Sequence, residues 1–161
     1  MIRTRIGLWM LAALAAGLLG SSAQAQTFKP FTDVATVCPD CWAQRYDHIA
    51  LKGGQMVYAR VLAENPAFYV LERFGELRAV GRDKVERVER HEALTAEQQA
   101  SVRDQILFVD GGVLVGQITQ EFPDTGWYQL EYGRFVHLAS QTQISLVFKA
   151  GKEIFRAPPV K

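Results

Sequence analysis

Residues 48–88 read HIALKGGQMVYARVLAENPAFYVLERFGELRAVGRDKVERV, and this stretch decides the fold. Short runs rich in Val, Tyr, Phe and Leu alternate here with Gly and Pro, a composition typical of small antiparallel β structure. Gly53 and Gly54 separate two such runs and predict a tight hairpin, because glycine takes a positive φ at low cost. Pro66 then ends a strand, since proline cannot donate a ladder hydrogen bond.

The strands that this stretch predicts follow one another through short turns. After the hairpin, Val57, Ala59, Val61 and Ala63 share one face of a strand, because side chains alternate between the two faces. Further strands are predicted at residues 68–74, 77–80 and 83–88, with a turn at Gly75. We therefore expect one bent antiparallel unit over residues 45–92.

A second stretch with the same order of features begins at Ile106. Its Gly111-Gly112 pair takes the place of Gly53-Gly54, and dropping one residue then aligns Ala59 with Gly116 and Glu64 with Glu121. Two extra residues, Thr125 and Gly126, bring Tyr69 opposite Tyr128 and Leu71 opposite Leu130. One further deletion near Phe74 places Gly75 opposite Gly133 and Leu77 opposite Phe135. The pattern predicts an internal duplication, although a chance likeness of two small β units is the alternative that three gaps leave open.

The predicted second unit covers residues 106–156 and ends in a hairpin around Gly151, with residues 157–161 as a tail. A helical connector is predicted at residues 93–105, because Thr95 and Gln98 have the spacing of a capping box. Each unit has only about forty-five residues, which is near the lower size limit for an independent core. We therefore expect the two units to pack on each other or to share strands.

The first 25 residues have the pattern of a secretory signal peptide. Arg3 and Arg5 precede an uncharged run from residue 6 to 19, and the triplet Ala23-Gln24-Ala25 fits a cleavage site. The apolar run is too short to cross a bilayer, which favours cleavage over the alternative of an uncleaved membrane anchor. We expect a secreted or periplasmic protein without a transmembrane anchor once residues 1–25 are removed.

The charge balance argues against a nucleic-acid partner. Without Arg3 and Arg5, the chain from residue 26 has 16 basic and 17 acidic residues. A near-neutral chain with dispersed charges provides no basic surface for phosphates. The three histidines, His48, His91 and His137, lack the spacing of metal ligands, so we expect no metal and no cofactor.

Cys38 and Cys41 are the only cysteines of the chain and lie in a lead-in, residues 26–44. In an exported protein, an even count at this spacing predicts an internal disulfide that clamps a local turn. The alternative is thiol-disulfide exchange, because C-x-x-C is the spacing of such oxidoreductases. Asp40 within the ring and the absence of alternating strands and helices afterwards argue against that enzyme.

The order of strands and turns in residues 48–88, and more faintly in residues 106–147, resembles the small SH3-like or Sm-like barrels. The resemblance is in turn spacing, and it implies a mainly β protein with two small barrel repeats packed together and joined by one short helix. It also implies a binding module, and bacterial SH3-like domains point to cell-wall peptides or other envelope components.

Aromatic residues are the candidate ligand contacts, because a large ring that is exposed is costly unless it binds something. The candidates are Trp42, Tyr58, Tyr69, Trp127 and Tyr128. Strand aromatics are also common core residues, and this reading stays open for the pairs in matching strands. The overall prediction is a non-enzymatic binding or assembly module of the cell envelope that recognises a protein or a cell-wall component. Self-association through exposed strand edges is compatible with it.

Overall fold

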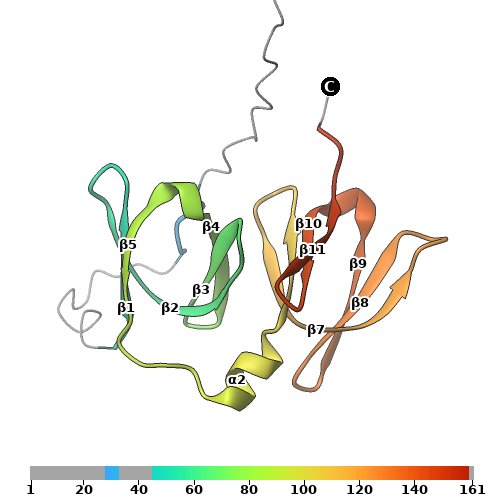
Figure 1. Ribbon diagram of the computed structural model, residues 1–161, viewed down its shortest axis with the longest axis horizontal. Coiled ribbons are helices and arrows are strands. Elements are labelled where there is room, and N and C mark those ends of the chain that lie inside the picture. Colours follow the sequence, from blue (N-terminus) through green and yellow to red (C-terminus); the bar gives the residue numbers. More distant parts are fainter. Residues whose placement is uncertain (1–27, 33–44, 160–161) are drawn as a thin grey trace, which may run out of the picture.

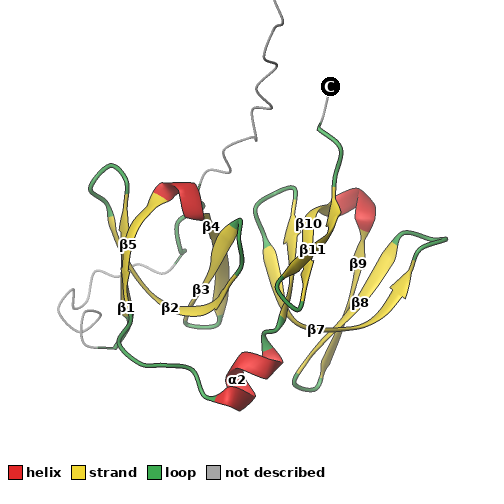
Figure 2. Cartoon of the chain, in the orientation of Figure 1, coloured by secondary structure: helices red, strands yellow, loops and turns green. Residues whose placement is uncertain are grey.

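The structure is a computed structural model that describes residues 28–32 and 45–159. These residues form a mainly β protein with two antiparallel sheets, of five and six strands, and one α-helix (Figure 2). The first sheet contains β1 (Asp47–Leu51), β2 (Met56–Glu64), β3 (Phe68–Arg73), β4 (Glu76–Gly81) and β5 (Val85–Glu89). The second contains β6 (Asp104–Phe108), β7 (Val113–Phe122), β8 (Trp127–Tyr132), β9 (Phe135–Ser140), β10 (Ile144–Lys149) and β11 (Lys152–Arg156). The helix is α2 (Ala96–Ser101).

The two sheets have the same strand order. The first runs β4-β3-β2-β1-β5, and the second runs β9-β8-β7-β6-β10 with β11 added at its end. A short 3-10 turn precedes the last shared strand in each sheet, at Arg82–Lys84 and at Gln141–Gln143. Figure 1 shows two strongly bent sheets side by side, with α2 in the segment that joins them.

The first hairpins match without the gap that the sequence comparison introduced. The N–H of Leu51 donates to Gln55 O in one sheet, and the N–H of Phe108 donates to Gly112 O in the other. Gly54 and Gly111, with φ of 86° and 85°, therefore occupy the same position. The expected pairing of Gly53-Gly54 with Gly111-Gly112 was shifted by one residue, because it matched glycine pairs rather than the turn position that needs a positive φ.

The β3–β4 and β8–β9 hairpins correct the expected alignment in the same way. Arg73 pairs with Glu76 and Tyr132 pairs with Phe135, so Phe74, not Gly75, corresponds to Gly133. Likewise Glu76, not Leu77, corresponds to Phe135. With one insertion of two residues, in the loop between β7 and β8, residues 47–91 then align with residues 104–150.

A β-bulge changes the face that Ala63 was expected to occupy. The pairing of β2 with β3 shifts between Val61 and Ala63. Val57, Ala59 and Val61 share one face as predicted and are buried inside the first sheet, but Ala63 lies on the opposite side, against the second sheet. A bulge inserts one unpaired residue, so the alternation of side chains reverses beyond it.

The core has three parts, two enclosed by single sheets and one between them. Ile49, Val61 and Leu71 belong to the cluster inside the first sheet, and Ile106, Leu130 and Val147 to the cluster inside the second. Phe68 of β3 meets Phe148 of β10 in the third cluster, with ring centroids 5.7 Å apart. The two sheets thus share a buried apolar interface, as the small size of each unit requires.

Residues 28–32 close one side of the first sheet. The Phe31 ring is buried in the inner cluster of that sheet, and the Arg73 guanidinium lies 4.5 Å from its centroid. The N–H and hydroxyl of Thr32 both donate to Glu76 of β4, at 2.9 Å. This segment therefore covers the outer strand β4 and part of the core behind it.

The connector is shorter than the sequence predicted. The capping box is confirmed: Thr95 Oγ1 accepts from the N–H of Gln98, and the Gln98 side chain accepts from the N–H of Thr95. The second sheet begins at Asp104, two residues before the expected start at Ile106. Within the described residues, α2 is not long and apolar enough to span a membrane.

Candidate binding surface

The aromatic candidates separate into different environments. Trp127 of β8 is 40% exposed, and Tyr58 of β2 is half-buried with its ring edge-on to His48. Tyr69 is half-buried beneath the Arg82 guanidinium, which lies 4.6 Å from its ring. Tyr128 is a core residue, and its hydroxyl accepts a hydrogen bond from Gln141. The structure therefore does not bring the four candidates that it describes together in one site.

The remaining candidates stay predictions. Cys38, Cys41 and Trp42 lie outside the described residues, so the disulfide and its alternative, thiol-disulfide exchange, are not addressed by the structure.

An exposed apolar surface lies around Trp127, on the outer face of β7, β8 and β9. Trp127 is the cross-strand partner of Phe122 on the neighbouring strand β7, and the Phe122 side chain is 38% exposed. On β9, Val136 and Leu138 are 60% and 62% exposed, and both point to the same side as Trp127 because their partners on β8 are Glu131 and Gln129. We call Phe122, Trp127, Val136 and Leu138 the outer apolar face.

A small polar network borders the outer apolar face. Gln129 Nε2 donates to Thr119 Oγ1 and to Glu131 Oε1, each at 3.2 Å, and Thr119 Oγ1 donates to the same Glu131 oxygen at 3.1 Å. These bonds hold the Glu131 carboxylate beside the apolar side chains. A surface of this kind, with apolar residues at its centre and satisfied polar groups at its rim, is typical of protein contacts.

The same face of the first sheet is covered by the second sheet. By strand pairing, Phe68 corresponds to Trp127, Leu77 to Val136 and Ala79 to Leu138. All three belong to the interface cluster or pack against it, and Phe68 is only 2% exposed. The same face of the sheet is therefore buried in the interface in the first unit and exposed to solvent in the second.

Sequence reasoning found Trp127 and missed Phe122, Val136 and Leu138. Its faint signal was in β9, Phe-Val-His-Leu-Ala-Ser, which contains no Lys, Arg, Asp or Glu. A strand with one exposed face normally alternates apolar and polar residues, and β9 has apolar residues on both faces. In the described part of the chain, β9 therefore exposes one apolar face, formed by Val136 and Leu138.

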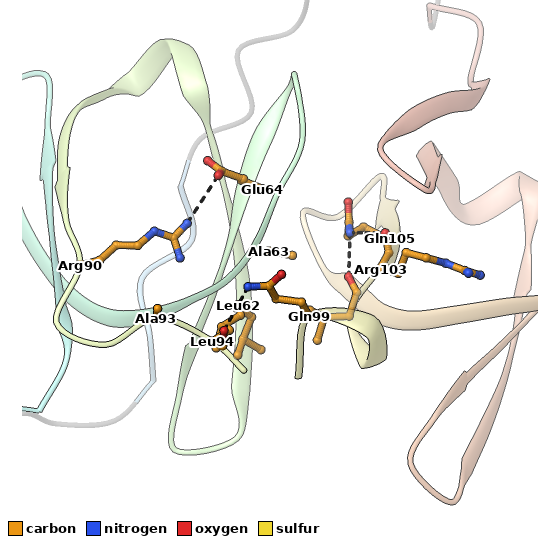
Figure 3. A pocket seen from close by; sticks show the side chains of 10 residues that line it. Leu62, Ala63, Glu64, Arg90, Ala93, Leu94, Gln99, Arg103 and Gln105 are labelled. Atoms are coloured by element: carbon orange, nitrogen blue, oxygen red, sulfur yellow. Dashed lines mark hydrogen bonds and ion pairs between the residues drawn. The ribbon is translucent and has the colours of Figure 1, made fainter. Parts of the chain in front are cut away.

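A groove lies between the two sheets beside α2 (Figure 3). Its volume is about 440 Å³, and Leu62, Ala63 and Val102 provide apolar walls. The charged groups at its rim already have partners within the protein, since Arg90 contacts Glu64 at 3.7 Å and Arg103 contacts Asp104 at 3.1 Å. A smaller cavity, of about 280 Å³, lies near Asp47 and His91. The described residues hold no group of His, Cys, Asp and Glu suited to a metal ion.

Two buried aspartates hold the strands that support these surfaces. In the first sheet, Asp47 accepts from the N–H of Val61 at 2.7 Å and of His91 at 2.6 Å. In the second, Asp104 accepts from the N–H of Ile118 at 2.7 Å and of Ala150 at 2.8 Å. Each carboxylate thus joins the second strand of its sheet to a backbone N–H one or two residues beyond the last shared strand.

The surroundings of Asp104 also set its charge. Burial opposes ionisation of this carboxyl, but hydrogen bonds from the Arg103 guanidinium and from the N–H groups of Ala150 and Ile118 outweigh the effect. The pKa of Asp104 therefore lies below its ordinary value, and the pKa of Arg103 lies above its own because of the same pairing.

Comparison of this chain with protein-family models, curated proteins and solved structures found no match.

Proposed function

We propose that this protein is an exported, non-enzymatic binding or assembly module of the cell envelope, built from two related small β barrels. The single observation that carries the proposal is the outer apolar face on β7, β8 and β9. Its counterpart in the first sheet is buried against a protein surface. The same face in the second sheet is suited to the same kind of contact, because exposed apolar surface rimmed by polar groups marks protein interaction sites.

The barrel part of this proposal is supported by matching strand order and by matching registers. Both sheets place their strands in one order, and both have the 3-10 turn before the last shared strand. The buried Asp47 and Asp104 bind equivalent backbone groups. These likenesses favour descent from one duplicated unit over two units that share only turn residues.

Export is proposed from the signal-like pattern of residues 1–25, and the ligand class is proposed from the chemistry of the face. Apolar and aromatic side chains with few charges suit a protein surface better than a polysaccharide or a phosphate-rich polymer. We therefore favour an envelope protein over a cell-wall glycan as the partner.

Site-directed photocrosslinking in intact cells tests the proposed function. A photoreactive residue at position 138 should form a defined adduct with a protein, because Leu138 lies within the outer apolar face. The matched control places the same residue at position 154 on β11, where Ile154 is an exposed apolar residue on another outer strand. Absence of an adduct at position 138, or equal adducts at both positions, would contradict the proposal.

A further inference from the structure

We infer that the edge of the outer apolar face formed by β9 pairs antiparallel with β9 of a second copy of this chain, so that the two outer apolar faces lie side by side in one sheet. This inference rests on the proposed function and names a partner for the strand edge that borders the same surface. It follows from three observations: the chemistry of the four outer strands, the direction of the free backbone groups of β9, and the charges on the alternative docking face.

The outer strands of the two sheets are protected from pairing except for β9. β5 contains Glu86, Arg87 and Glu89, and β11 contains Lys152, Glu153 and Arg156. β4 contains Glu76 and Arg78 and is also bound by residues 28–32, because Arg78 donates to Pro30 O. Charges and covering segments of this kind prevent edge pairing. β9 has neither within the described part of the chain.

The backbone of β9 presents a regular set of groups at its open edge. β8 and β9 join through two residues, Gly133 and Arg134, and their pairing continues without a bulge from Tyr132–Phe135 to Trp127–Ser140. In such a hairpin, alternate residues direct their N–H and C=O groups to the partner strand and away from it. The backbone N–H and C=O of His137 therefore point to β8, while those of Val136 and Leu138 point away from β8, to the open edge.

These positions favour pairing about a twofold axis. If two β9 strands meet antiparallel with His137 opposite His137, Val136 of each copy lies opposite Leu138 of the other. Each such pair can exchange two backbone hydrogen bonds, and the four side chains lie on the side that also carries Trp127. The contact is self-complementary, as a twofold interface requires, and contains no like charges on β9 that would oppose it.

A head-to-tail arrangement is disfavoured by the charges of the first sheet. The second sheet covers the first with Leu107, Val115 and Phe148 among others. The corresponding positions on the first sheet are Ala50, Tyr58 and Glu89, and Glu89 forms ion pairs with Arg87 at 2.7 Å and with His48 at 3.5 Å. If the outer apolar face of another copy covered Glu89 and its ion pairs, charged side chains would be removed from water, which costs free energy. A closed pair of copies is therefore favoured over an open chain of them.

Analytical ultracentrifugation of the full chain, purified as the exporting cell processes it, tests the inference over a range of protein concentrations. The wild-type protein should sediment as a dimer that dissociates on dilution. Leu138→Lys should raise the dissociation constant roughly a hundredfold, because it places a charge at the edge of both copies. Ile154→Lys adds the same charge to β11 and should leave the constant unchanged.

Hydrogen exchange distinguishes strand pairing from a looser contact. The amides of Val136 and Leu138 should be protected in the wild-type dimer and exchange rapidly in Leu138→Lys. Val136→Lys serves as the second variant if Leu138→Lys lacks the far-ultraviolet circular dichroism of the wild type, and it should dissociate the dimer likewise. A wild-type protein that is monomeric at every concentration, or equal effects of lysine at positions 138 and 154, would overturn the inference.

The two proposals fail in different ways. A monomeric wild-type protein whose position-138 crosslink has a mass other than that of two chains overturns self-association and supports binding to another protein. A monomeric protein without any adduct at position 138 overturns both. An adduct with the mass of two chains, together with concentration-dependent sedimentation, supports both.

Discussion

Asp104 is a charged residue that the fold buries completely. Its side chain is fully buried and still accepts hydrogen bonds from Arg103, Ile118 and Ala150. Removing a charged acceptor from such a site leaves buried N–H groups without their partner, which costs more than an ordinary surface substitution. The stability of the second sheet therefore depends on the ionised carboxylate of Asp104.

Asp104→Asn should lower the free energy of unfolding by about 3 kcal/mol at neutral pH. The pKa of Asp104 is lower in the folded protein than in the unfolded chain. Its contribution is therefore complete above the unfolded carboxyl pKa and is lost as the pH falls through the folded pKa. Urea unfolding at several pH values should show the difference from wild type shrinking in acid. Asp124→Asn, on an exposed loop, is the control, and an acid-independent difference would contradict this account.

The sequence alone did not single out Asp47 or Asp104. An aspartate at the start of a strand normally predicts a turn or an exposed end. The relation between the two becomes visible only when the hairpins are placed in register, 57 residues apart. Their backbone partners, His91 and Ala150, lie more than forty residues away in the chain and give no local signal.

Among the elements, the short segment at residues 28–32 has an effect beyond its length. Sequence reasoning described it as an extended lead-in, which agrees with its lack of helix or strand, but did not predict that Phe31 is a core residue. A single Phe between Pro30 and Thr32 has no periodic pattern from which burial could be inferred.

Phe31→Ala should destabilise the protein by about 3 kcal/mol, because it removes a buried ring from the inner cluster of the first sheet. Phe74→Ala is the matched control, since Phe74 is 66% exposed at the tip of a hairpin and its loss should cost clearly less. Chemical denaturation of both variants measures the comparison. Equal losses for the two would show that residues 28–32 do not cover the core in solution.

At the scale of the whole molecule, the interface cluster makes the two sheets depend on each other. The mainly β class, the strand-rich units and the short helix were predictable, because Gly and Pro mark the turns and Thr95 with Gln98 marks the cap. The interface was predictable only in outline, from the small size of each unit. Which faces meet depends on the bulge after Val61 and on the pairing of β3 with β4, which composition does not encode.

A fragment of residues 26–92 should not show the cooperative unfolding transition of the complete chain, because Phe68 and Val70 would lose the surface that covers them. In the complete chain, Phe148→Ala should lower the free energy of unfolding by about 4 kcal/mol and destabilise both sheets together. Urea unfolding followed by tryptophan emission and by circular dichroism measures this. A fragment as stable as the complete chain would exclude a shared core.

Because Phe68 and Trp127 occupy corresponding positions, the stabilising effect of burying such a ring under a second sheet can be measured within one molecule. Both aromatic residues begin the third strand of their sheet, but one is covered and the other is open. Truncation of each to Ala in separate variants compares burial of an aromatic ring under nearly equal backbone geometry. The excess loss for Phe68 gives the stabilising effect of cover by a neighbouring sheet. Trp127 has no such cover within the described part of the chain, so its loss gives the effect of an aromatic ring on an open face.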